Sequence, residues 1–150
     1  MAHSYCSSLY HCVFSTLNRR ALITPHLKER LFPYMGGIAR ENDMKALVIG
    51  GIENHAHLLL TLPSTLSVAR ALQIIKGSSS KWVHETFSVH AGFEWQQGYG
   101  AFSISVSDVD RTIQYIKNQE VHHKGQSFKD EFRAFLKKHG IEIDERYIWG

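Results

Sequence analysis

Residues 54–62, with the sequence NHAHLLLTL, constrain the fold of this 150-residue chain more than any other segment. Side chains two positions apart on a β-strand point to the same side of the sheet. His55 and His57 therefore share one face. The opposite face is apolar and can be buried; it carries Ala56, Leu58, Leu60 and Leu62. The segment predicts a strand that packs on a core with one side and presents two imidazoles on the other.

Hydrophobic periodicity and capping signals predict the other elements. Thr24 followed by Pro25 is typical of a helix start, because the hydroxyl caps the first turn and proline fits its first position. Ser107 with Asp110 is an acidic version of the capping box and predicts a later helix, and the same spacing recurs at residues 127 and 130. The expected strands are 9–16, 45–52 and 98–105, and the expected helices are 25–42, 68 to 84 or 87, 107–123 and 127–140.

The order of these elements is strand, helix, strand, strand, helix, strand, and then helices. This order matches the split β-α-β plan of ferredoxin-like domains. We therefore expect an α+β domain: a ferredoxin-like sandwich with a four-stranded antiparallel sheet and helices on one face. We also expect C-terminal helices, of which the one over 107–123 carries Tyr115. We expect the other face of the sheet to be free for a ligand, and His55 and His57 to point to it.

Composition is that of a globular protein, since 43% of the residues are hydrophobic and 21% are charged. The length fits one domain, residues 1–150. The chain has no apolar run long enough to cross a membrane and no signal-peptide pattern at its start, so we expect a cytoplasmic protein. Cys6 and Cys12 are too few for a disulfide framework and are expected to be reduced. The net charge of +3 permits contact with nucleic acid without requiring it.

Two groups of side chains are candidates for a catalytic site. His55 and His57 supply two imidazoles, which form half of a site for a divalent cation with open positions for a substrate. The alternative for this pair is two half-exposed histidines on a solvated sheet face. On the helix expected after residue 107, Tyr115 and Gln119 lie one turn apart, on a stripe separate from the apolar one. A phenol and an amide on one edge of a helix can face the same site.

Together these groups suggest attack by a tyrosine on a phosphodiester with the help of a metal. A bound cation that polarises a phosphoryl oxygen reduces the repulsion that protects a phosphodiester. Imidazoles with an amide or a carboxylate suit Mn²⁺ and accept Mg²⁺. The phenol of Tyr115 must lose its proton as it attacks, and the sequence does not identify the base that takes it.

Several motifs occur together and in order along nearly the whole chain. They are YHCVFST at 10–16 followed by Arg19 and Arg20, NHAHLL at 54–59, KG at 76–77 with SKW at 80–82, WQQGYGAFS at 95–103 and YIKNQ at 115–119. With these motifs the chain resembles the single-tyrosine transposases of the HUH endonuclease class. This family moves insertion sequences as single-stranded DNA and includes relatives associated with repeated extragenic palindromes (REPs).

The resemblance implies a role for each candidate residue. His55, His57 and Gln119 would bind a divalent metal, Mg²⁺ or Mn²⁺, and Tyr115 would be the nucleophile that takes the 5′ phosphate and frees a 3′ hydroxyl. The DNA partner would be single-stranded, with hairpin ends that the protein recognises. The family also implies a homodimer, in which the tyrosine of one subunit can complete the metal site of the other. It implies a prokaryotic protein that joins the nucleoid when it is bound to DNA.

Other residues leave two interpretations open. Arg19, Arg20, Lys76 and Lys81 are candidate contacts to DNA phosphates, and Trp82, Trp95 and Tyr99 are candidate stacking partners for bases. The alternative is that these are solvated charges and core aromatics. His11 is either an outer support of the metal site or a structural histidine. Glu53 either helps to hold the metal or caps a turn.

Three other functions compete with the transposase. A domesticated relative that processes repeated extragenic palindromes would use the same chemistry. A non-catalytic nucleic-acid-binding module is also compatible with a ferredoxin-like sheet, although such modules place aromatic pairs where this strand has imidazoles. A histidine-triad nucleotide hydrolase would need a further histidine at the position of Leu59, so we set it aside.

Overall fold

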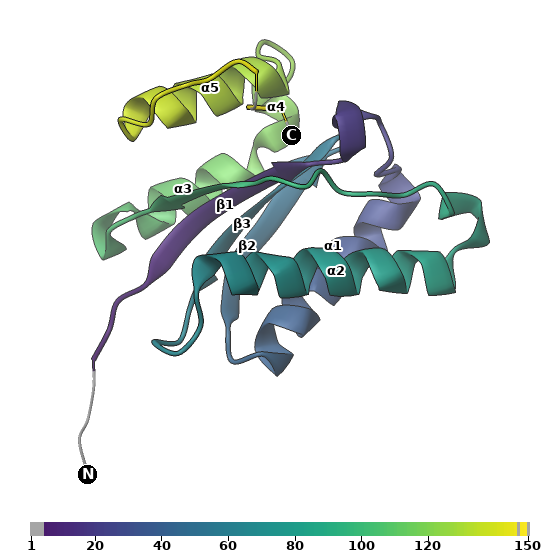
Figure 1. Ribbon diagram of the computed structural model, residues 1–150, viewed down its shortest axis with the longest axis horizontal. Helices are drawn as coiled ribbons and strands as arrows, with labels where there is room; N and C mark the ends of the chain where they lie inside the picture. The colour runs from purple at the N-terminus through teal and green to yellow at the C-terminus, as the bar shows by residue number, and fades with distance from the viewer. Residues whose placement is uncertain (1–4, 147, 150) are drawn as a thin grey trace.

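The computed structural model describes residues 5–146, 148 and 149. Its centre is a four-stranded sheet in the order β2-β3-β1-β4, in which every neighbouring pair is antiparallel (Figure 1). The strands are β1 Leu9–Ser15, β2 Lys45–Ile52, β3 His55–Thr61 and β4 Gly100–Ser103. The sheet order and the helices between the strands confirm the expected ferredoxin-like α+β fold.

Helices α1, Pro25–Glu41, and α2, Val68–Thr86, cover one face of the sheet (Figure 1). Both begin with a hydroxyl cap: Thr24 Oγ1 accepts from the backbone nitrogen of Leu27 at 3.2 Å, and Ser67 Oγ accepts from that of Arg70 at 3.1 Å. Apolar side chains of both helices meet the sheet in the main core, which includes Leu31, Leu72, Cys12, Phe14, Leu58 and Leu60. This is the apolar face that the sequence of β3 predicts. Two short 3₁₀ segments, η1 Leu17–Arg19 and η2 Ser88–His90, lie in connections.

The opposite face of the sheet is covered as well (Figure 1). Helices α3 Val109–Lys117, α4 Gln119–His122 and α5 Phe128–Lys138 lie over it. The expectation of a free face is therefore wrong, and the side chains of His55 and His57 are fully buried. The physical reason is a second apolar cluster on this side, in which Val13 and Phe102 of the sheet pack against α5 through Phe128, Phe132 and Leu136.

Two glycines of the sheet allow these covering helices to come close. A Cβ atom on Gly50 of β2 would lie 2.6 Å from the carbonyl oxygen of Ile116 in α3. A Cβ atom on Gly100 of β4 would lie 2.6 Å from the ring of Phe132 in α5. Contacts this short are repulsive. A larger residue at position 50 would push α3 away from the sheet, and one at position 100 would displace the ring of Phe132.

The helix expected over 107–123 is two helices with a break between them. Ser107 lies in a short 3₁₀ segment, η3 Val106–Asp108, and its hydroxyl is 2.8 Å from that of Ser105 instead of capping a helix. Helix α3 begins only at Val109 and ends before Asn118, whose φ of −97° and ψ of 24° are not helical. Helix α4 then starts at Gln119. Asparagine favours helix ends over helix interiors, which accounts for the break at this position.

The cysteines and the lengths of the helices complete the description of the fold. Cys6 and Cys12 are both free thiols, in agreement with the expectation from their small number. Among the residues that the structure describes, no helix has both the length and the apolar character needed to span a bilayer.

Candidate active site

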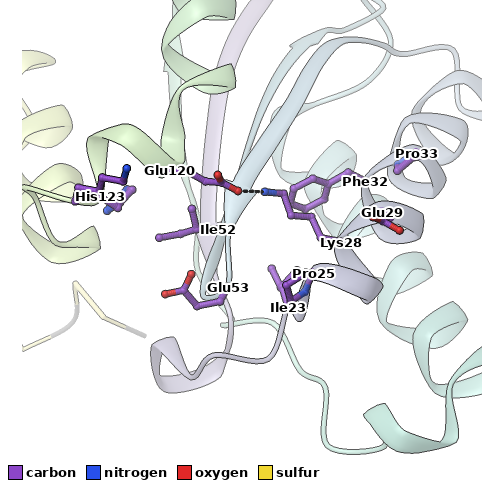
Figure 2. A pocket seen from close by; sticks show the side chains of 11 residues that line it. Ile23, Pro25, Lys28, Glu29, Phe32, Pro33, Ile52, Glu53, Glu120 and His123 are labelled. Atoms are coloured by element: carbon purple, nitrogen blue, oxygen red, sulfur yellow. Dashed lines mark hydrogen bonds and ion pairs between the residues drawn. The ribbon is translucent and has the colours of Figure 1, made fainter.

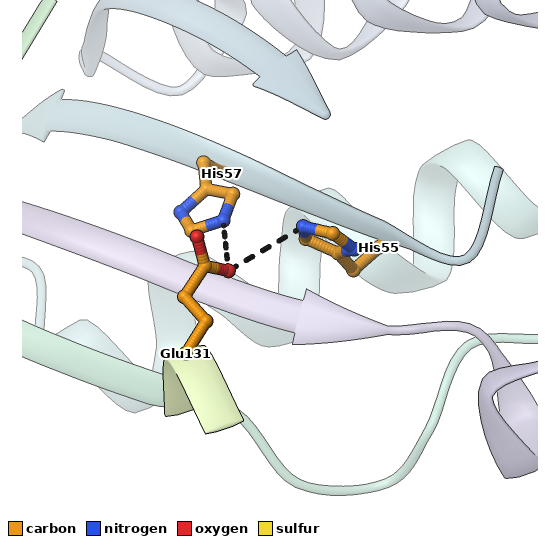
Figure 3. A group of neighbouring side chains, drawn as sticks. All are labelled: His55, His57 and Glu131. Carbon is orange, nitrogen blue, oxygen red and sulfur yellow. Dashed lines mark hydrogen bonds and ion pairs between the residues drawn. The ribbon is translucent and has the colours of Figure 1, made fainter. Parts of the chain in front are cut away.

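Strand β3 and helix α5 bring three potential metal ligands together (Figure 3). His55, His57 and Glu131 each offer a donor atom, and these atoms all lie within 4.8 Å of one another. The Oε1 of Glu131 is 3.0 Å from the Nε2 of His57 and 3.5 Å from the Nε2 of His55. Two imidazoles and a carboxylate form a donor set suited to Mn²⁺ or Mg²⁺, so these residues fit the expected cation.

Glu131 is the site residue that the sequence analysis missed. It faces the sheet because Phe128 and Phe132 flank it on the buried stripe of α5. The hydroxyl of Ser127 accepts from the backbone nitrogen of Asp130 at 3.2 Å and fixes the start of this helix, as the capping pattern predicts. An acidic residue within an apolar helical stripe was the signal available in the sequence, because such a position is rarely charged without a partner.

The Nδ1 atoms of His55 and His57 both have hydrogen-bond partners. The Nδ1 of His57 lies 2.7 Å from the Nε2 of His11, and the Nδ1 of His55 lies 2.8 Å from the Oδ1 of Asn54. Both contacts orient the rings so that each Nε2 points to Glu131. Such supporting partners fix ring orientation and tautomer in metal sites. Of the two interpretations of His11, the structure favours the supporting one.

Gln119 also reaches the cluster. Its Oε1 is 2.9 Å from the Nε2 of His55, and its amide nitrogen donates to the Oε2 of Glu131 at 3.3 Å. His123 joins from the end of α4, with its Nε2 3.1 Å from the Oε1 of Gln119 and 3.3 Å from the Oε1 of Glu131. The amide oxygen and the carboxylate therefore both lie beside the two imidazoles of β3.

Tyr115 lies on the other side of the same carboxylate. Its hydroxyl donates a hydrogen bond to the Oε2 of Glu131, and its ring centroid is 5.9 Å from that of His57. The Oε1 of Glu131 faces the histidines, and the Oε2 faces the tyrosine. The structure thus brings all four residues singled out in the sequence into one cluster of a single chain: His55, His57, Tyr115 and Gln119.

Burial and mutual contacts set the protonation states of the cluster. Burial, and then the neighbouring His57, lower the pKa of both His55 and His11 to about 3. Burial by itself raises the pKa of Glu131, but the hydrogen bond and charge interaction with His57 and the hydrogen bond from Tyr115 bring it below its usual range. Burial and the bond to Glu131 raise the pKa of the Tyr115 hydroxyl above its ordinary value. A neutral His55 beside the ionised carboxylate of Glu131 is in the form that binds a cation.

A cavity of about 670 Å³ lies beside the cluster, between α1, the end of β2 and α4 (Figure 2). His123 forms part of its wall and links it to Gln119 and Glu131. Lys28 and Glu120 form an ion pair of 3.2 Å across it. Glu53 also lines this cavity and is not one of the three grouped ligands. Its backbone oxygen accepts from the backbone nitrogen of Ile23 at 2.9 Å.

The four basic residues singled out in the sequence lie outside the cluster. Arg20 is exposed, and the guanidinium of Arg19 lies 5.4 Å from the ring centroid of Trp149. The ammonium of Lys76 donates to the backbone oxygens of Gln97 and Gly98, and burial lowers its pKa to about 8. Lys81 forms a long ion pair of 3.9 Å with Glu85. A DNA contact at these positions stays a prediction.

The three aromatic candidates differ in exposure. Trp95 is a core residue, 6% exposed, and its indole nitrogen donates to the hydroxyl of Ser79 at 3.0 Å. Trp82 stacks on Tyr34 with ring centroids 4.2 Å apart. Tyr99 is exposed, so its ring is available to a base. Stacking on DNA is therefore set aside for Trp95 and stays a prediction for the other two.

Comparisons with known proteins agree with this architecture. The family model described as "Transposase IS200 like" matches residues 4–119. The fold is similar to that of a protein from Deinococcus radiodurans R1 described as a candidate transposase, with 21% identity and a TM-score of 0.63, over 79% of this chain and 96% of that one. It is also similar to a REP-associated tyrosine transposase bound to a REP hairpin, with 17% identity and a TM-score of 0.61, over 82% of this chain and 73% of that one. No curated protein matches the chain.

Proposed function

The chain belongs to the IS200-like transposase family, and we propose that it cleaves and rejoins single-stranded DNA at the hairpin-bearing ends of a mobile element, with Tyr115 as the nucleophile. One observation carries the proposal: the hydroxyl of Tyr115 and the paired imidazoles of His55 and His57 contact the same carboxylate, that of Glu131. A nucleophile and a cation site that share one residue can act on one phosphate group.

The metal ligands of the proposed site are His55 and His57, with Glu131 as the third. Gln119 is the alternative third ligand, since its Oε1 also lies beside His55. A divalent cation, Mg²⁺ or Mn²⁺, would supply polarisation of a phosphoryl oxygen when bound. His11 and Asn54 hold the two rings in the orientation that ligation requires.

The protein residues account for the proton balance of the proposed step. The oxygen of Tyr115 attacks the phosphorus atom and forms a phosphotyrosine bond with the 5′ end of the downstream strand. The bond from phosphorus to the 3′ oxygen breaks, and that oxygen takes up one proton to become a 3′ hydroxyl, which balances the one proton that Tyr115 releases. In the resting site the pKa of the phenol is raised and that of Glu131 is lowered, so the proton moves only as the bond to phosphorus forms and makes the phenol acidic. The Oε2 of Glu131, which already accepts the hydrogen bond of the phenol, then takes this proton. Because the phosphotyrosine retains the bond energy, a later 3′ hydroxyl can reverse the step and rejoin DNA.

Hairpin recognition is part of the proposal. The REP-associated transposase that shares this fold is bound to a REP hairpin, which supports a structured single-stranded substrate here. It equally supports the second candidate, a domesticated relative that processes repeated extragenic palindromes by the same chemistry. The non-catalytic module is disfavoured, because helices α3 to α5 cover the sheet face on which such modules stack bases.

We propose that the active site is complete within one chain. Family resemblance predicts a homodimer with shared sites, but the ring of Tyr115 lies 5.9 Å from that of His57 in the same chain. The functional unit then spans the whole domain, residues 1–150, since Glu131 lies beyond the residues matched by the family model. Such an enzyme would act on DNA in the cytoplasm of a prokaryotic cell.

The direct test uses single-stranded oligonucleotides that carry the hairpins flanking the gene, incubated with the protein and Mn²⁺. A strand labelled at its 3′ end should give a labelled protein that survives denaturation, and a strand labelled at its 5′ end should give only a shorter free product. The reverse labelling pattern would exclude a 5′-phosphotyrosine. Absence of any cleavage by a folded, metal-binding protein, with these and with other hairpin strands, would argue against the nuclease function.

A further inference from the structure

Another cavity, of about 430 Å³, is lined by Tyr115 and by β4, the strand at the opposite edge of the sheet from β2, whose end borders the cavity of Figure 2. Its walls come from His11 of β1, from β4 and the segment that follows it, and from α3 and α5. The residues that matter for its chemistry are Phe102, Phe135, His139, Lys138, Arg111 and Tyr115. Its volume is within the range of small-molecule sites in proteins, and is enough for one nucleotide.

Aromatic rings form one wall of this cavity. Phe102 stacks on Phe135 with centroids 5.4 Å apart, and on His139 with centroids 4.7 Å apart. Phe102 is buried, whereas His139 is exposed. Phe102 thus covers one face of the imidazole and fixes the orientation of this ring at the edge of the cavity. An exposed ring with a fixed orientation can stack on a base that is not stacked on its neighbours in the DNA.

A positively charged residue lines this cavity together with the tyrosine. Lys138 lines the 430 Å³ cavity and also a smaller one, of about 220 Å³, whose wall includes Tyr115 and Glu131. Within the part of the chain that the structure describes, Lys138 forms no ion pair. Among the described residues that line the 430 Å³ cavity, Asp108 supplies the one carboxylate, and it is already paired with Arg111. The unneutralised charge of this cavity is therefore positive.

The cavity of Figure 2 has the opposite character. Glu29, Glu53 and Glu120 contribute three carboxylates to its wall, against two lysines, Lys28 and Lys124. Carboxylates at this density repel a phosphate, so the backbone of a DNA strand is favoured at the cavity beside Tyr115 and disfavoured at the other.

We propose that the cavity beside Tyr115 is a nucleotide subsite of single-stranded DNA, in which Lys138 binds a phosphate and His139 stacks on the base adjacent to the cleaved linkage. The placement next to the cleaved linkage rests on the proposed role of Tyr115; the binding of a nucleotide does not. The subsite uses α5, so it lies outside the residues matched by the family model.

The test is a titration of ¹⁵N-labelled protein with deoxyadenosine 5′-monophosphate, followed by amide shifts in buffer with EDTA. The expected shifts fall on residues of β4 and the end of α5, around Ser103, Lys138 and His139. Deoxyadenosine without the phosphate should bind several-fold more weakly, because the contact to Lys138 is lost. Shifts confined to the cavity of Figure 2, or no shift at millimolar nucleotide, would overturn the proposal.

Point variants sharpen this test. His139→Ala should weaken nucleotide binding about tenfold, in the range measured for base stacking on aromatic side chains. Lys138→Gln should weaken it several-fold and remove most of the preference for the monophosphate over the nucleoside. Lys137→Gln, on the adjacent exposed position of α5, is the matched control and should bind like the parent protein. Equal affinities in all three variants would contradict the subsite.

The two proposals fail in different experiments. Nucleotide binding at this cavity without any covalent DNA adduct would argue against the nuclease function and leave the subsite in place. A covalent adduct at Tyr115 without nucleotide binding at this cavity would refute the subsite and leave the nuclease function in place.

Discussion

The hydroxyl of Tyr115 donates a hydrogen bond to the Oε2 of Glu131, while the Oε1 of that carboxylate lies 3.0 Å from the Nε2 of His57. One carboxylate therefore connects the proposed nucleophile with the proposed cation site. This arrangement gives Glu131 two roles that can be separated by experiment, as metal ligand and as acceptor of the phenolic proton.

Glu131→Gln should lower the affinity for Mn²⁺ at least tenfold, because a ligating carboxylate and its charge are lost from a buried site. Isothermal titration calorimetry of the variant and of an exposed control, Glu41→Gln, measures this. If Glu131→Gln binds Mn²⁺ like the parent while Gln119→Leu binds it weakly, the third ligand is Gln119.

The metal-free protein should lose stability between pH 7 and pH 5. His11 and His55 have a pKa of about 3 in the folded chain, against about 6.5 when unfolded. The unfolded state therefore binds more protons in this window, and unfolding becomes easier as the pH falls, by roughly 2 kcal/mol for each histidine at pH 5. Below about pH 4.5, protonation of Glu131 in the unfolded state adds to the loss, since its pKa is lowered on folding.

Urea unfolding at the two pH values measures this effect. His11→Gln should remove about half of the loss, because one of the two titrating groups is gone, and His26→Gln, at an exposed position, should leave the loss unchanged. Equal free energies of unfolding at pH 7 and pH 5 in the parent protein would show that the histidines are not buried in the neutral form.

Gly50→Ala should destabilise the fold by about 1–3 kcal/mol, because the added methyl group would overlap the backbone of α3 at Ile116. Thermal unfolding measures the change. Gly77→Ala is the matched control, since a Cβ there meets no atom within 4 Å in the middle of α2, and it should stabilise by about 0.5–1 kcal/mol. Retained stability in Gly50→Ala would mean that α3 does not pack directly on β2.

A mixture of Tyr115→Phe chains with His57→Ala chains should show no recovery of covalent DNA adducts, because Tyr115 lies beside His57 of its own chain. The adduct yield on denaturing gels, relative to each variant alone, is the measurement. Recovery to a substantial share of the parental yield would show that the tyrosine acts on the site of a partner subunit, as the family resemblance first suggested.

Much of the fold follows from local sequence rules. The alternation of residues 54–62 sets both faces of β3, and the hydroxyl caps at Thr24 and Ser127 place the starts of α1 and α5. That His55 and His57 lie on the same face of β3 could also be predicted from the sequence, because the two-residue period of a strand fixes which side chains share a face. These features depend on neighbours in the chain, which a sequence displays directly.

Tertiary packing decides what could not be predicted. The packing of α3 to α5 over the histidines depends on residues that are far apart in the sequence, such as Val13, Phe102 and Phe132, which belong to one apolar cluster. Glu131 enters the site only because this cover forms, so no local spacing connects it to β3. The break at Asn118 likewise departs from the helix expected over 107–123, although Tyr115 and Gln119 still reach the same carboxylate.

The identity of the residue that carries the DNA tests the central claim most directly. After reaction with hairpin oligonucleotides and Mn²⁺, nuclease trimming and peptide mass spectrometry locate the modified residue, with Tyr99→Phe as the control for Tyr115→Phe. We predict a nucleotide remnant on the peptide that contains Tyr115, present in Tyr99→Phe and absent in Tyr115→Phe. A remnant on another residue, or an undiminished adduct in Tyr115→Phe, would contradict the claim.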